Sequence, residues 1–163
     1  MVEIVVIVLI VLVLAAILLP WYNRPHPMRQ ASCLNNVKNI ELALIMYAQD
    51  SGGVGPPVPR WPDRLQPYLR SRQLYVCPKA PKLPVGYIYG AHVPLRPLHE
   101  LAHPEAVLTL WEGDPGVHTF AFRHNGALNV GYADGHAKGL TSEALYGALL
   151  EGYAKGIDPA RPQ

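Results

Sequence analysis

The chain has 163 residues, with 14 basic and 12 acidic side chains and a formal net charge of +2. So small a charge does not by itself favour binding to nucleic acid or to a membrane surface. Half of the residues are hydrophobic and 17 are proline, which excludes a wholly disordered chain, a coiled coil and a multi-span membrane protein. Beyond its first 20 residues the chain is long enough for one modest core and too short for two domains.

Residues 2–19 are apolar throughout except for Glu3. As a helix these 18 residues are about 27 Å long, close to the hydrocarbon thickness of a bilayer. Trp21 and Tyr22 follow, and such rings suit a membrane–water interface. The pattern predicts a membrane-spanning helix. Because an unpaired carboxylate is costly in hydrocarbon, Glu3 either lies at the headgroup level as the first polar residue or pairs with a cationic partner on another chain.

A second helix is predicted over residues 27–50, after a break at Pro25 and Pro27. Apolar residues recur there at helical spacing and predict one stripe that packs on a small sheet: Cys33, Val37, Ile40, Leu44 and Tyr47. Four polar residues are expected to lie largely off this stripe: Arg29, Asn36, Lys38 and Glu41.

Residues 51–73 read as a turn-rich loop and a short helix at 61–69. Short β-rich segments bounded by turn residues then predict strands at 74–77, 86–89, 105–111, 118–123, 127–132 and 137–140. Asn125-Gly126 and Asp134-Gly135 are strong hairpin signals, so residues 118–140 are expected to form a three-stranded antiparallel meander. A final helix is predicted over 141–156, capped by Thr141 or Ser142. The fold class is therefore α+β.

Two features of the sequence together resemble a known family. Glu3 precedes Pro20 by 17 positions within an apolar helix, and His124 is followed after nine residues by Asp134-Gly135. The chain resembles type IV pilins and type II secretion pseudopilins, in the prepilin-like branch with a C-terminal H-x9-DG motif. The segment 29–50 is similar to the continuation of the helix in that branch. The resemblance implies a filament-core helix and its break at 1–26, an extracytoplasmic globular domain at 27–163, and a leader upstream of Met1.

The resemblance also implies a function. The chain is expected to be a structural subunit of a pilus-like or pseudopilus filament, stored as a single-pass protein in the bacterial cytoplasmic membrane and then exposed at the cell surface. Glu3 would pair with the N-terminal amine of a neighbouring copy, and the helix break at Pro20–Pro27 would allow stretching during assembly. The expected partners are further copies of the chain, the membrane and an inner-membrane pilus or secretion machinery, but not nucleic acid.

A different class of protein remains open, namely a membrane-anchored extracytoplasmic binding or enzymatic domain that does not polymerise. We expect no enzyme activity, catalytic residue, metal or cofactor. The sequence His99-Glu100-Leu-Ala-His103 matches the H-E-x-x-H zinc-protease pattern, which needs one continuous helix. Prolines at 94, 97 and 104 confine any helix there to less than two turns, so this match is not expected to form a metalloprotease.

Cys33 and Cys77 are the only cysteines. They are either two buried thiols or, if the domain lies outside the cytoplasm, a disulfide that closes the helix onto the sheet. We expect the disulfide, which would contribute about 4 kcal/mol in the chain-entropy model.

The H-x9-DG segment is interpreted as a structural turn motif made of five residues: His124, Asn125, Gly126, Asp134 and Gly135. In the alternative interpretation, His124, Asp134 and His136 converge on a metal or hydrogen-bond one another. The hairpin offers few carboxylates, whereas calcium requires six or more oxygen ligands.

Overall fold

The computed structural model describes residues 2–22, 27–90, 97–116 and 119–154. Within these residues there are four α-helices and five strands, in the order α1 (Val2–Tyr22), α2 (Pro27–Asp50), α3 (Trp61–Leu65), β1 (Tyr87–Tyr89), β2 (Leu108–Asp114), β3 (Thr119–Phe120), β4 (Ala127–Tyr132), β5 (Ala137–Thr141) and α4 (Ser142–Ala154). Short 3₁₀ turns lie between them at Val58–Arg60, Gln66–Tyr68, Arg72–Tyr75, Leu98–Glu100 and Pro104–Ala106.

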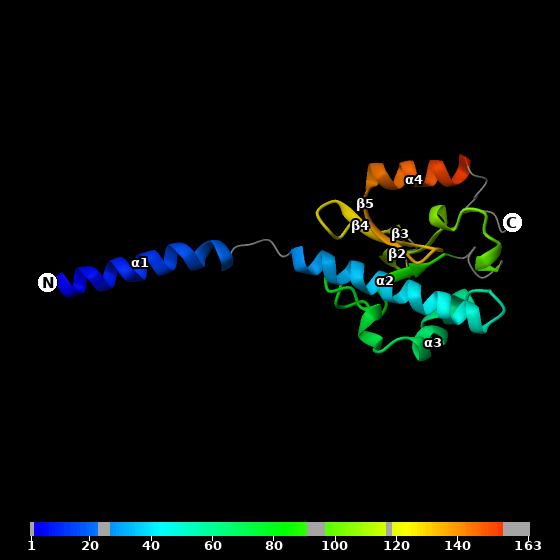
Figure 1. Cartoon of the computed structure of the whole chain (residues 1–163), viewed down its shortest axis with the longest axis horizontal. Coiled ribbons are helices and arrows are strands. Elements are labelled where there is room, and N and C mark those ends of the chain that lie inside the picture. Colours follow the sequence, from blue (N-terminus) through cyan, green and yellow to red (C-terminus); the bar gives the residue numbers. More distant parts are fainter. Residues whose placement is uncertain (1, 23–26, 91–96, 117–118, 155–163) are drawn as a thin grey trace.

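The domain has three layers, with the sheet between α2 and α4 (Figure 1). The strands are antiparallel in the order β1-β2-β4-β5, and β3 pairs with the end of β2. Alternate residues of β4 face opposite layers, since successive side chains of a strand point to opposite faces. Leu128 and Val130 pack with Leu145 of α4, whereas Asn129 and Gly131 face the α2 layer. The expected α+β arrangement of a helix on an antiparallel sheet is therefore confirmed.

Helix α2 has the bounds predicted from the sequence, Pro27–Asp50. Its stripe forms the main core together with Leu65, Tyr87 and Leu110; Tyr47 at its end is half-buried. Two residues expected off the stripe lie inside: Glu41 is fully buried and Asn36 is 8% exposed. Each has a polar partner that the helical pattern could not reveal, because that partner comes from a distant segment: Thr109 for Glu41 and the Val76 carbonyl for Asn36.

The expected strands need three corrections. Residues 72–75 form a 3₁₀ turn, so no strand begins at 74. The strand predicted at 105–111 begins later, at Leu108, because Pro104–Ala106 forms another 3₁₀ turn. The meander is also wrong: β4 and β5 form the expected hairpin, but β3 pairs with β2. Residue 118, the first residue of the strand predicted at 118–123, lies outside the described residues.

Helix α4 follows β5 directly and matches the predicted final helix through Ala154. The Oγ1 atom of Thr141 accepts a hydrogen bond of 3.3 Å from the backbone N–H of Ala144. This bond satisfies one of the free donors of the first turn, so Thr141 is the cap. Residues 155–156 of the prediction lie outside the described part.

The predicted membrane-spanning helix is contradicted. None of the helices within the described residues combines the length and apolar character that crossing a membrane requires. The expected single-pass location in the bacterial cytoplasmic membrane is wrong for the same reason. Pro25, in the predicted break, lies outside the described residues, while α1 ends at Tyr22 and α2 begins at Pro27.

Candidate functional site

Helix α1 is set apart from the folded core (Figure 1). Its large apolar side chains between residues 2 and 17 are exposed on all sides, from 47% at Val6 to 77% at Val2. Glu3 is the only charged residue of the helix and is also exposed. Pro20 lies within the helical range of α1, and its side chain lies outside the described part. The structure therefore presents an apolar helix that this domain does not cover.

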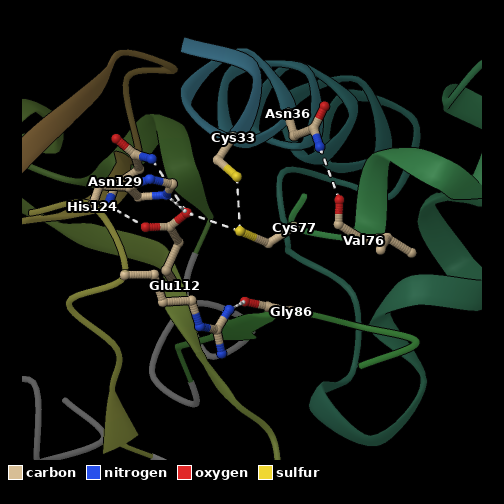
Figure 2. A network of polar contacts seen from close by, with 9 residues as sticks. Cys33, Asn36, Val76, Cys77, Gly86, Glu112, His124 and Asn129 are labelled. Atoms are coloured by element: carbon tan, nitrogen blue, oxygen red, sulfur yellow. Dashed lines mark hydrogen bonds and ion pairs between the residues drawn. The ribbon is translucent and has the colours of Figure 1, made fainter. Parts of the chain in front are cut away.

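The second candidate feature is a network of polar side chains inside the domain, where α2 meets the sheet (Figure 2). Cys33 of α2 and Cys77, which follows the 3₁₀ turn at 72–75, are both fully buried. Their Sγ atoms are 2.7 Å apart, and both cysteines are free. The expected proximity of the two cysteines is thus found, while the disulfide bond itself stays a prediction.

The carboxylate of Glu112 extends this contact towards the sheet (Figure 2). Cys77 Sγ lies 3.5 Å from Glu112 Oε1, and His124 Nε2 lies 2.8 Å from the same oxygen. The backbone N–H of Asn129 donates to Glu112 Oε2 at 2.8 Å, and its side-chain Nδ2 donates to Oε1 at 3.2 Å. All five side chains are buried. Glu112 is therefore the central acceptor of the network.

The two thiols share a proton unequally. The hydrogen bond from Cys33 lowers the pKa of Cys77 to about 6, against the opposing effect of burial. The same hydrogen bond and burial raise the pKa of Cys33. A thiolate can act as a metal ligand or as a nucleophile. Because both cysteines are fully buried, large reagents cannot reach them.

The H-x9-DG motif splits into two separate places. His124 points inward to Glu112, whereas Asp134 is exposed and Asp134 Oδ1 lies 2.6 Å from His136 Nδ1. Asp134 and His136 therefore hydrogen-bond each other, as the alternative allowed, but His124 does not join them, because it contacts Glu112. Asn125 has φ 53° and Gly126 has φ 80°, so these two residues form the tight turn that the sequence predicted.

The H-E-x-x-H match does not lie on one helix. His99 and Glu100 belong to the 3₁₀ turn Leu98–Glu100, and His103 precedes the separate turn Pro104–Ala106. His103 Nδ1 lies 3.3 Å from Glu105 Oε1. The two histidines therefore lack the common helical face that this zinc-protease pattern requires.

Sequence reasoning missed Glu112 and Asn129. Asn129 lies in the strand predicted at 127–132 and Glu112 directly follows the one predicted at 105–111, and neither is a defining position of a motif. An acid at position 112, within the strand Leu108–Asp114 of otherwise largely buried residues, was the available signal, because buried charges are paired or bind metals. Within the described residues, the side chains that could hold a metal ion are Cys33, Cys77, Glu112 and His124.

Comparisons with family models, with curated proteins and with solved structures found no match to this chain.

Proposed function

We propose that the chain is a structural subunit of a pilus-like or pseudopilus filament, and that copies of it polymerise through α1. The observation that carries this proposal is the exposed apolar surface of residues 2–17. A helix that is apolar all round is normally buried, and burying each Val, Leu or Ile contributes about 1.5–3 kcal/mol. The domain has a core of its own, so the cover has to come from outside this chain.

Further copies of the same chain are the occupant that fits best. An α1 helix surrounded by other α1 helices buries apolar side chains on every side, which pairing with a single flat partner would not do. The resemblance of the Glu3 to Pro20 spacing to that of pilins supports the same occupant. In such a bundle Glu3 would lose its water, and it would pair with the N-terminal amine of a neighbouring copy. A buried carboxylate is stable only with such a partner.

The experiment is assembly of the purified full chain. The purified chain is kept in detergent, and the detergent is then removed by dilution. The product is measured by sedimentation and negative-stain electron microscopy. We expect filaments of uniform width. The Glu3→Gln variant leaves the neighbouring amine unpaired, a loss of about 3–5 kcal/mol, and should raise the critical concentration by about 100-fold or more.

Glu143→Gln is the matched control, because Glu143 is an exposed acid in the first turn of α4. It should assemble as the wild type does, and circular dichroism should show both variants folded. Dispersed monomers, amorphous aggregate, or equal assembly of the Glu3 and Glu143 variants would contradict the proposal. Dispersed monomers would favour the alternative of a domain that does not polymerise.

A further inference from the structure

Four buried side chains direct metal-ligating atoms towards one point between α2 and the sheet (Figure 2). They come from four separate segments and are called here the Cys–Glu–His quartet: Cys33, Cys77, Glu112 and His124. Their ligand atoms all lie within 4.8 Å of one another. We propose that the reduced quartet binds one zinc ion as a closed structural site.

The donor set indicates the metal. Two thiolates and an imidazole are soft and borderline ligands, which select zinc over magnesium or calcium, since these two hard cations take oxygen. Four protein ligands without an open position are typical of structural zinc. The complete burial of Cys33, Cys77 and Glu112 fits a closed site and leaves no place for a substrate.

The spacing also fits a zinc ion after small shifts. With Zn–S near 2.3 Å and Zn–N or Zn–O near 2.1 Å, a tetrahedron has edges of about 3.4–3.8 Å. Cys77 Sγ and Glu112 Oε1 are already 3.5 Å apart. The sulfurs, at 2.7 Å, would separate by about 1 Å, and His124 Nε2 would move from Glu112 Oε1 by roughly 0.6 Å.

Electrostatics favour the same occupant. Each short contact in the quartet requires a proton between two atoms that otherwise repel: sulfur with sulfur, and the His124 nitrogen with the Glu112 oxygen. Zinc replaces these shared protons with two positive charges. The thiol protons leave to solvent, and the buried carboxylate gains a cation that offsets its charge.

The surroundings hold the carboxylate in place for such a role. Asn129 of β4 donates its backbone N–H to Glu112 Oε2 and its side-chain N–H to Oε1, and Oε1 also faces the sulfur and the imidazole. Hydrogen bonds of this kind orient ligating carboxylates. Because Cys33 lies on α2 and Glu112 on β2, a bound ion would tie the helix to the sheet. A Cys33–Cys77 disulfide would do so too, but it removes both thiolates and excludes the metal.

The test uses the full chain, reduced and treated with chelator, and titrated with Co²⁺ as the probe before competition with Zn²⁺. We expect one Co²⁺ per chain, with the visible bands of tetrahedral geometry and a sulfur-to-cobalt charge-transfer band. Cys77→Ser should remove about half of the charge-transfer intensity. His124→Asn should weaken binding at least tenfold, whereas the matched control His136→Asn should leave it unchanged.

A measurement on the wild type keeps the test decisive if a variant fails to fold. Zinc added to the reduced apo chain in weak buffer should release protons and raise the melting temperature. Reduced wild type that takes up neither Co²⁺ nor Zn²⁺ would overturn the proposal, as would equal affinities of the His124 and His136 variants. A purified chain lighter by two hydrogen atoms that still binds no metal after reduction would establish the disulfide instead.

Discussion

Glu41 is an acid buried in the middle of the interface between α2 and the sheet. Its side chain is fully buried, and Thr109 Oγ1 donates a hydrogen bond of 2.6 Å to Glu41 Oε1. Glu41 Oε2 has no hydrogen-bond partner within the described residues. Burial, with a smaller contribution from the charge of Asp134, raises the pKa of Glu41 to about 8. Glu41 is therefore protonated at neutral pH in the folded chain.

The Glu41→Gln substitution should stabilise the domain at neutral pH. Between pH 4.5 and 8 the folded chain binds a proton at Glu41 that the unfolded chain has lost, so the free energy of unfolding falls as pH rises. The slope approaches 1.4 kcal/mol per pH unit, or about 2.5 kcal/mol between pH 5 and pH 7. Gln keeps the acceptor for Thr109 and does not titrate, so the variant should gain about 3 kcal/mol at pH 7.

The assay is urea unfolding of wild type and variant at half-unit steps from pH 5 to pH 8. The difference in unfolding free energy between the two proteins isolates Glu41, because every other titrating group is shared. We expect this difference to grow with pH over the whole range and to grow more slowly as pH 8 is approached. Parallel stability curves, or a variant that loses stability at pH 7, would refute the reasoning.

Four further substitutions have expected effects on stability that can be checked by thermal or urea unfolding. Gly131→Ala places a Cβ against the Glu41 carboxylate and should destabilise by about 1–3 kcal/mol; Gly147→Ala, in open space on α4, should instead stabilise by about 0.5–1 kcal/mol. Gly126→Ala forces a Cβ into φ 80° and should destabilise by about 1–2 kcal/mol through strain alone, since no atom lies near. Thr141→Ala removes the cap of α4 and should destabilise by about 1 kcal/mol; no loss would show that the cap is dispensable.

The sequence predicted those helices and turns whose formation depends on neighbouring residues alone. Helix α2 has an apolar stripe and a first-turn proline, and the turn at Asn125-Gly126 has the residues that positive φ requires, so both were found. The pairing of β3 with β2 was missed because Asp114-Pro115-Gly116, which is a turn signal, was not interpreted as a link between two paired strands. The onset of β2 was missed because Pro104 permits a 3₁₀ turn as readily as an extended start.

The candidate site was half predictable. Cys33 and Cys77 stood out as the only cysteines, and their proximity followed from placing one on the helix stripe and one at the sheet. The part played by His124 was not visible, because its partner Glu112 directly follows the strand predicted at 105–111 and belongs to no motif. Long-range pairing between a buried acid and a histidine leaves no spacing pattern in a single sequence.

The most direct test of filament assembly through α1 is a labelling experiment with two cysteine variants of the full chain. Leu9 of α1 and Leu150 of α4 are 56% and 50% exposed, while the native thiols are buried. Leu9→Cys and Leu150→Cys are treated with a maleimide before and after the detergent is diluted out. We predict that assembly lowers the labelling rate at position 9 at least tenfold and leaves that at position 150 nearly unchanged. Equal labelling at position 9 in dispersed and assembled protein would contradict the proposal that α1 forms the core of a filament.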